Sequence, residues 1–149
     1  MITDRTQQDV DEAIAITEKI KKGETLTESE ILTFERGFVT INTLNRIESK
    51  QAEIAQILRD KGYLVNIVNK QWTYNDIFDL VEHNRLIGNV DKLRDAFHTY
   101  KLTPDTPYYL YEFRNMNDFE QILVDIEMLI NNMSSAYIFA SDDVYLGGI

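Results

Sequence analysis

The stretch NDFEQILVDIEMLINNMSSAY, residues 117–137, decides the fold that this sequence predicts. Its apolar residues recur every three or four positions, which is the period of one face of an α-helix. Asn117 suits the N-cap of that helix and Glu120 its third position, a variant of the capping box. A continuous apolar face of this length must be buried, either inside the domain or against another subunit. Its members are Phe119, Ile122, Leu123, Ile126, Leu129, Ile130, Met133, Ala136 and Tyr137.

A second long helical pattern runs from Phe38 to about Lys61, between Gly37, a candidate interruption, and Gly62, which ends it. Its apolar residues alternate at spacings of three and four, which is heptad-like, with Gln51 as the polar exception. An intramolecular seam is the default interpretation, but two long seams in one short chain also favour an oligomer. The candidate seam residues are Leu44, Ile47, Gln51, Ile54, Leu58, Phe119, Ile126 and Met133.

Two shorter helices are predicted before this pattern. The first covers about residues 7–22, with Thr6 as its N-cap and Gly23 just beyond its end. The second begins at a capping box formed by Thr27 and Glu30.

The middle of the chain mixes helical and extended signals. Residues 63–70 are rich in Val and Ile but form a short run, so they predict a strand or an extended connector. The next helix starts either at a cap made by Thr73 and Asp76 or later, near Asp79. Its apolar face comprises Leu86, Val90, Leu93 and Phe97.

These patterns predict a mainly α protein. The expected architecture is a small helical bundle with long heptad-like helices and one or two short extended segments. A chain of 149 residues favours one domain and is long enough to bury a core. We therefore expect a single helical domain over residues 1–149, with a short C-terminal tail from about residue 141, where the helical pattern dissolves.

The charge of the chain limits its classes of partner. Its 25 acidic and 15 basic residues give a formal net charge of −10. Such a field repels phosphate backbones and anionic lipid surfaces, so neither nucleic-acid binding nor membrane docking is expected. No apolar run approaches the roughly 18 residues of a membrane span. Residues 1–4 lack the basic and apolar regions of a signal peptide.

The sequence contains no catalytic constellation that stands out. The absence of cysteine excludes a disulfide, a thiolate zinc site and a cysteine nucleophile. For the two histidines, His83 and His98, a place on a helix is a commoner role than catalysis, and no nucleophile or phosphate-binding motif accompanies them. Asp142 and Asp143 fit a solvated tail better than a calcium site. We expect no enzymatic activity, no cofactor and no metal.

The aromatic residues are the best binding candidates. If Trp72, Tyr74, Tyr109 and Tyr111 are exposed, they offer a stacking platform for a sugar or a peptide. In an extended segment over residues 108–113, alternate aromatic side chains fall on one face. Burial in the core is the favoured alternative, because aromatic residues at alternating spacing usually bury a large area.

Several short motifs along nearly the whole chain carry a resemblance to a known group of proteins. They are Asp4-Arg5-Thr6 with Asp9-Val10, Glu35-Arg36-Gly37, Asn42-Thr43-Leu44-Asn45-Arg46-Ile47-Glu48, Trp72-Thr73-Tyr74 with Asp76-Ile77, Asn84-Arg85, Asn89-Val90 with Leu93-Arg94, Asn117-Asp118-Phe119-Glu120 with Ile122-Leu123, and Tyr145-Leu146-Gly147-Gly148. In these motifs the chain resembles small uncharacterised helical proteins encoded by phages and prophages of Firmicutes, often near tail genes. It departs from them at Phe78-Asp79, where some have a Pro-Thr-type turn, and at His83, which has no counterpart.

The resemblance implies a virion component and brings no catalytic residues with it. We therefore expect a non-enzymatic structural or interaction module of a phage particle, tail or fibre associated and oligomeric. The alternative is a receptor- or glycan-binding module that uses exposed aromatics, and a wall hydrolase with a Glu/Asp pair ranks third. The expected partners are further copies of the chain, other virion proteins and, for the alternative, a host surface glycan. The expected location is the virion, with the host cytoplasm during assembly.

Overall fold

The computed structural model describes residues 1–96 and 103–147, with side chains described as far as residue 133. Within these residues the protein is mainly helical, as predicted, and contains no strand. Residues 63–70 lie in a connector rather than a strand, and residues 108–112 are mostly bends that lead into the last helix. In chain order the helices are α1 (Gln7–Lys21), α2 (Glu28–Gly37), α3 (Ile41–Asp60), α4 (Leu80–Ala96) and α5 (Phe113–Gly147).

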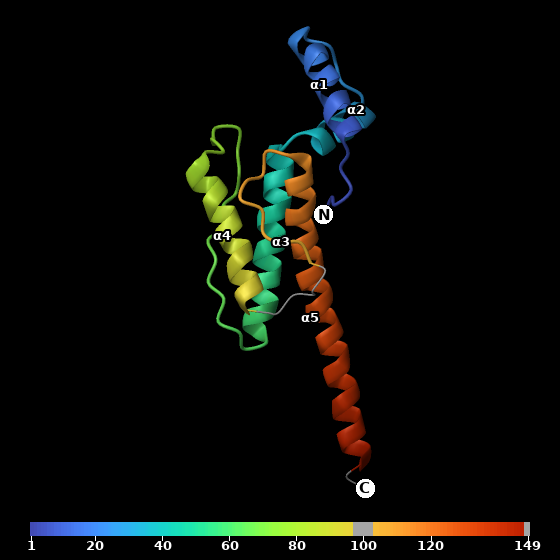
Figure 1. Ribbon diagram of the computed structural model, residues 1–149, viewed down its shortest axis with the longest axis vertical. Coiled ribbons are helices and arrows are strands. Elements are labelled where there is room, and N and C mark those ends of the chain that lie inside the picture. Colours follow the sequence, from blue (N-terminus) through green and yellow to red (C-terminus); the bar gives the residue numbers. More distant parts are fainter. Residues whose placement is uncertain (97–102, 148–149) are drawn as a thin grey trace.

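The helices α3, α4 and α5 lie side by side and run in the same direction (Figure 1). The ion pairs between α3 and α5 agree with this common direction. Arg46 pairs with Glu120, and Lys50, further along α3, pairs with Glu127, further along α5. Helices that run in the same direction need long connections, and residues 61–79 return along α3 and α4. The core between the three helices comprises Leu44, Ile47, Ile54, Leu58, Leu86, Val90, Leu93, Leu110, Phe119, Ile122, Leu123, Ile126 and Ile130.

The helices α1 and α2 form a hairpin at the end of the molecule where α3 and α5 begin (Figure 1). Thr6 caps α1 as predicted. Thr27 and Glu30 form the predicted capping box of α2. After α1, Gly23 adopts a φ of +73°, in the left-handed region that glycine tolerates best. The sequence therefore predicts both ends of α1 and the start of α2 correctly.

The two helices of the hairpin approach most closely at Gly37. A Cβ atom at this position would collide with the Cβ of Ala13 and the carbonyl oxygen of Asp9, both in α1. Beside it, Arg36 Nε lies 2.9 Å from Asp9 Oδ1. This hydrogen bond is the main cause that lowers the pKa of Asp9 to about 2. The glycine at the end of α2 therefore serves close packing as well as chain direction.

A Gly37→Ala protein is expected to be less stable by about 1–3 kcal/mol, because the added methyl group forces α1 and α2 apart. Gly88→Ala is the matched control, since a Cβ at Gly88, within α4, meets nothing within 4 Å. That change should stabilise the protein by about 0.5–1 kcal/mol, because alanine favours a helix interior. Urea unfolding measures both free energies. Equal stability of the Gly37→Ala and wild-type proteins would contradict the close approach.

The apolar seam predicted from the second pattern is buried within the chain. Thr40 caps α3, which therefore begins at Ile41, three residues later than predicted. A side chain with no remaining surface cannot contact another subunit, which corrects the expectation of an oligomer seam here. Of the candidate seam residues, only Met133 remains substantially exposed, at 37%. The residues buried in the chain's own core are Leu44, Ile47, Gln51, Ile54, Leu58, Phe119 and Ile126.

The last helix begins earlier than predicted and continues further. Because α5 starts at Phe113, the prediction of Asn117 as its N-cap is wrong. The helix continues to Gly147, through the segment predicted to be a tail. Residues 134–147, here termed the α5 extension, continue past the ends of α3 and α4 (Figure 1). The side chains of the predicted stripe residues Ala136 and Tyr137 lie outside the described ones.

The helix α4 begins at the later of its two predicted positions. The Asp79 side chain accepts a hydrogen bond from the backbone N–H of Glu82 at 3.0 Å, so Asp79 caps the helix. Thr73 and Asp76 bond to each other in a separate turn. Of the predicted apolar face, Leu86, Val90 and Leu93 are buried, and Phe97 lies outside the described residues.

Candidate functional site

The only tryptophan of the chain anchors the connector of residues 61–79 to α3. Trp72 is 3% exposed. Its backbone N–H donates to Asn45 Oδ1 at 2.7 Å, and Asn45 Nδ2 donates to its carbonyl at 3.1 Å. Its indole Nε1 donates to Glu48 Oε1 at 3.0 Å. A shielded indole cannot stack on a ligand, so burial corrects the prediction of Trp72 as part of a binding platform.

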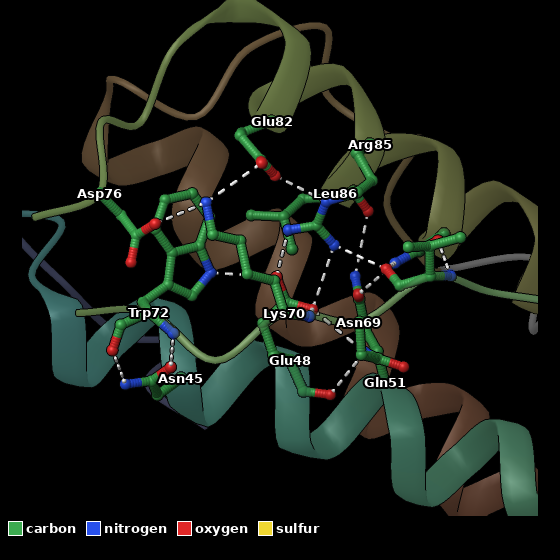
Figure 2. Close-up of polar contacts among 12 residues, drawn as sticks. Asn45, Glu48, Gln51, Asn69, Lys70, Trp72, Asp76, Glu82, Arg85 and Leu86 are labelled. Atoms are coloured by element: carbon green, nitrogen blue, oxygen red, sulfur yellow. Dashed lines mark hydrogen bonds and ion pairs between the residues drawn. The ribbon is translucent and has the colours of Figure 1, made fainter.

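Glu48 of α3 is the centre of a buried polar network (Figure 2). It pairs with Arg85 of α4, with 3.2 Å between Arg85 Nη1 and Glu48 Oε2. The same Oε2 accepts hydrogen bonds from Asn69 Nδ2 at 3.1 Å and from the backbone N–H of Lys70 at 3.2 Å. A carboxylate can be buried at low cost only when it is paired and hydrogen-bonded in this way. Glu48 therefore joins α3, α4 and the connector at one point.

Gln51 extends the network further along α3. This fully buried side chain donates to the carbonyl of Leu86 at 3.0 Å and accepts from Asn89 Nδ2 at 3.1 Å. Asn89 in turn bonds both backbone groups of Val68, at 3.3 Å and 2.9 Å. Side chains thus supply hydrogen bonds that a neighbouring strand would otherwise provide to the connector. This explains both the polar exception in the seam and the missing strand.

The outer edge of the network is an ion cluster around Lys70 (Figure 2). Lys70 Nζ lies 2.9 Å from Asp76 Oδ1 and 3.2 Å from Glu82 Oε1. The Lys70 hydrogen bond and then those of Thr73 lower the pKa of Asp76 to about 2. Hydrogen bonding to Arg85 is the main cause that lowers the pKa of Glu82. Both carboxylates are therefore ionised at neutral pH, as ion-pair partners are.

The geometry indicates that the network holds α3, α4 and the connector of residues 61–79 together. Sequence reasoning noticed Trp72 but did not predict Glu48, Asn69 or Arg85 as a site. A signal existed, because Glu48 lies four residues after Leu44 and three before Gln51, on the face of α3 that the seam predicts to be buried. An acidic residue at such a position needs a cationic partner nearby.

His83 fastens the connector before α5 to α4. It is 1% exposed, and its Nε2 accepts a hydrogen bond from the backbone N–H of Leu110 at 2.6 Å. Its ring stacks on Tyr111, with 5.2 Å between the ring centroids. Because Nε2 accepts, the proton of the neutral ring lies on Nδ1, which is buried and has no hydrogen-bond partner among the described residues. Burial lowers the pKa of His83, so the neutral form of the ring makes these contacts.

We expect mild acid to destabilise the protein through His83. The unfolded histidine, with a pKa near 6.5, binds a proton more readily than the buried one. This stability is therefore fully present above the unfolded pKa and is lost as the pH falls from there toward the folded pKa. The free energy of unfolding, measured from about pH 7.5 to pH 5, should fall less in His83→Gln than in the wild type. Identical slopes in the two proteins would refute this role.

The predicted tyrosines are exposed but do not form one platform. Tyr74, Tyr109 and Tyr111 are 96%, 44% and 66% exposed. Tyr74 lines an apolar groove that also involves α1 and α2. Tyr111 instead lines a small cavity of about 50 Å³ beside Arg5. With Trp72 buried, the four predicted ligand-binding residues are divided among separate places.

A second buried ion cluster ties the N-terminal segment to α5. Glu120 is fully buried, and its Oε1 lies 2.5 Å from Arg5 Nη2 and 2.9 Å from Arg46 Nη2. The Asn117 side chain bonds both backbone groups of Arg5, at 3.0 Å and 2.9 Å. The two residues predicted as a helix cap therefore hold residues 1–6 against the bundle.

Among the described residues, no group of three or more His, Asp or Glu side chains is arranged to hold a metal ion. In the same part of the chain, no helix combines the length and the apolar character needed to cross a membrane. Comparison with protein-family models, with curated proteins and with solved structures finds no match to this chain.

Proposed function

We propose that this protein is a non-enzymatic interaction module that self-associates through the α5 extension. The observation that carries the proposal is the length of α5, whose 35 residues compare with 20 in α3. At 1.5 Å per residue these lengths are about 52 Å and about 30 Å. No described element of the same chain lies beside the α5 extension (Figure 1). A partner is therefore needed to cover any apolar face that it carries.

The sequence of this region supports a partner rather than open solvent. Residues 131–141 contain no charged side chain. Met133 follows Ile126 by one heptad, yet Ile126 is fully buried and Met133 is 37% exposed. The stripe that forms the core of the chain therefore emerges from that core at Met133. An apolar helix face without a neighbour is typical of an interaction site.

Met133→Glu is expected to weaken self-association at least tenfold, because it places a charge on the emerging stripe. Met128→Glu is the matched control, since Met128 is 45% exposed on the same helix but lies off the stripe. Light scattering over a concentration series measures the mass of each protein. A wild-type chain that stays monomeric at high concentration would contradict the proposal.

We further propose that the assembly is part of a phage particle, tail or fibre associated. The resemblance of the sequence to phage and prophage proteins supports this placement, and other virion proteins are then the further partners. Mass spectrometry of purified particles of the phage that carries the gene tests it. A particle preparation without this chain would remove the placement and leave self-association untouched.

A glycan-binding module is the second candidate function. It is favoured by three exposed tyrosines on one connector, of which Tyr108 is 93% exposed and Tyr111 66%. Exposed aromatic faces are suited to stacking on sugar rings. Sedimentation with purified host cell walls tests this candidate, and a Tyr108→Ser, Tyr111→Ser double variant should then remain in the supernatant. Failure of the wild-type chain to sediment would exclude it.

A further inference from the structure

We propose that His83 is a proton-sensitive latch, which releases residues 108–112 from α4 in mild acid while the helices stay packed. These residues, here termed the latch segment, lie between Pro107 and the start of α5 at Phe113. The proposal concerns a movement within one chain. It therefore goes beyond the proposed self-association and does not depend on it.

The hydrogen bond between His83 and the latch segment requires an unprotonated Nε2. This atom accepts from the backbone N–H of Leu110 at 2.6 Å. A proton on Nε2 would turn the acceptor into a donor, so that two N–H groups would face each other. Nδ1 is also buried and has no acceptor among the described residues. Both nitrogens of a charged ring would thus lack an acceptor, and a buried donor without an acceptor destabilises the closed form.

The acidic side chains on the elements around the ring are bound to other groups. On α4, Asp79 accepts from a backbone N–H, and Glu82 pairs with Arg85. On α3, Glu48 pairs with the same Arg85. In the latch segment, Glu112 accepts from a tyrosine hydroxyl at 3.4 Å. None of these carboxylates is bonded to the ring, so none of them holds a proton there.

The other charged and aromatic neighbours do not favour a charged ring either. In the connector of residues 61–79, Asp76 pairs with Lys70. At the start of α5, Arg114 lies over the ring of Phe113. Stacking on Tyr111 would attract a charged imidazole. Burial nevertheless lowers the pKa of the histidine, so the closed form favours the neutral ring.

The contacts that precede the latch segment do not involve the histidine. Arg94 of α4 donates to the carbonyl of Pro104 at 2.6 Å and to Thr106 Oγ1 at 3.1 Å. Thr103 Oγ1 donates to Asp125 of α5 at 2.7 Å. The latch segment is followed directly by α5, which packs in the core of the bundle. Protonation therefore frees a short segment that stays attached at both ends.

Opening of the latch exposes surface that the closed form covers. The Leu110 side chain is fully buried in the core. One face of the Tyr111 ring is covered by the imidazole. Both become accessible beside Tyr108, which is already 93% exposed. Mild acid thus converts a closed connector into a larger apolar and aromatic surface.

A single introduced thiol measures the opening, because the chain contains no cysteine. Leu110→Cys places this thiol on the latch segment and keeps the backbone N–H that His83 accepts. Its rate of labelling by a disulfide reagent is divided by the rate for the urea-unfolded chain at the same pH, which removes the effect of thiol ionisation. The ratio should rise by up to about thirtyfold from about pH 7.5 to pH 5, because the open ring binds a proton with a pKa near 6.5.

Two matched variants serve as controls. Ile54→Cys reports global unfolding, because Ile54 is a fully buried core residue of α3. Its thiol should stay protected over the same pH range. The Leu110→Cys, His83→Gln double variant tests the proton itself. Glutamine keeps an acceptor and binds no proton in this range, so the labelling ratio should not change with pH.

Three results would overturn the proposal. A thiol of Leu110→Cys that stays protected at the acid end of the range would mean that the latch does not open. Parallel exposure of the Leu110→Cys and Ile54→Cys thiols would mean that the whole chain unfolds. A pH response that persists with His83→Gln would assign the opening to another group.

Hydrogen exchange provides a second measurement that leaves the core unaltered. In the wild-type chain, the protection factor of the Leu110 N–H should fall as the pH falls from about 7.5 to 5. The protection factor of Ile126, fully buried in α5, should stay constant. Constant protection at Leu110, or an equal fall at both residues, would contradict a local latch.

Discussion

Replacement of Glu48 by alanine is expected to lower the free energy of unfolding by about 3–5 kcal/mol. The change removes one of the two carboxylate partners of the Arg85 guanidinium, which is 18% exposed, and leaves only Glu82 opposite it. It also removes the acceptor of the Trp72 indole and of the Lys70 backbone N–H. Buried donors that lose their acceptor each cost about 1–3 kcal/mol. Denaturant unfolding followed by the fluorescence of Trp72 measures the loss.

Glu53→Ala is the matched control for this prediction. Glu53 lies on the same helix, is 52% exposed and pairs only with Lys50 among the contacts described here. An exposed ion pair of this kind contributes about 0–1 kcal/mol, so the change should be small. Glu48→Gln should fall between the two, because it keeps an acceptor for Trp72 and loses the charge opposite Arg85. If Glu48→Ala were as mild as Glu53→Ala, the network would not hold the connector.

Replacement of Glu120 by alanine is the second large effect, about 3–5 kcal/mol. Two guanidinium groups converge on its carboxylate, and that of Arg5 is 3% exposed. Removal of the carboxylate leaves Arg5 buried with no other charge partner among the described residues. We expect residues 1–6 to detach from the bundle as well. Hydrogen exchange at Arg5, whose N–H donates to Asn117 Oδ1 at 3.0 Å, reports this detachment, because the variant keeps that acceptor.

The size of the loss in unfolding free energy distinguishes an ion-pair role of Glu120 from a capping role. Loss of a helix cap costs roughly 0.5–2 kcal/mol and would leave residues 1–6 in place. The neighbouring Asp118→Ala serves as the control, because Asp118 is exposed near the same end of α5. Exchange at the Arg5 N–H should be unchanged in this control. A Glu120→Ala protein with wild-type exchange at Arg5 would argue against the ion pair.

The helices are predictable where local chemistry alone determines them. Thr6, Thr27 and Gly23 mark the ends of α1 and the start of α2 correctly, because caps act within one turn of the chain. The apolar stripe of α5 is likewise predictable, since Phe119 and Ile126 are buried as the period requires.

The start of α5 is not predictable in this way. Asn117 and Glu120 have the spacing of a cap, but they bond to Arg5, more than a hundred residues away in the sequence. A polar residue suited to a cap is equally suited to a distant partner, and sequence spacing does not distinguish the two. Asn89 is another polar residue with a distant partner. Its side chain bonds both backbone groups of Val68, as a neighbouring strand would, and sequence spacing does not reveal this partner.

The candidate site is likewise predictable only in part from the sequence. Trp72 is recognisable in the sequence, but its burial depends on Glu48 and Asn45, which α3 brings to it from far along the chain. Aromatic residues alone do not reveal whether they face solvent. Trp72 is buried because side chains of α3 bond to it, whereas Tyr74, two residues later, is exposed.

The common direction of α3, α4 and α5 has a consequence for the order in which the chain folds. The α1–α2 hairpin closes over a short turn, so its contacts are local. The three long helices meet only after connectors such as residues 61–79 have been ordered, and that loss of chain entropy precedes most of the gain from packing. Contacts between distant parts of a chain slow its folding. A bundle of this connectivity should therefore form more slowly than an antiparallel bundle of equal length, with its hairpin ordered first.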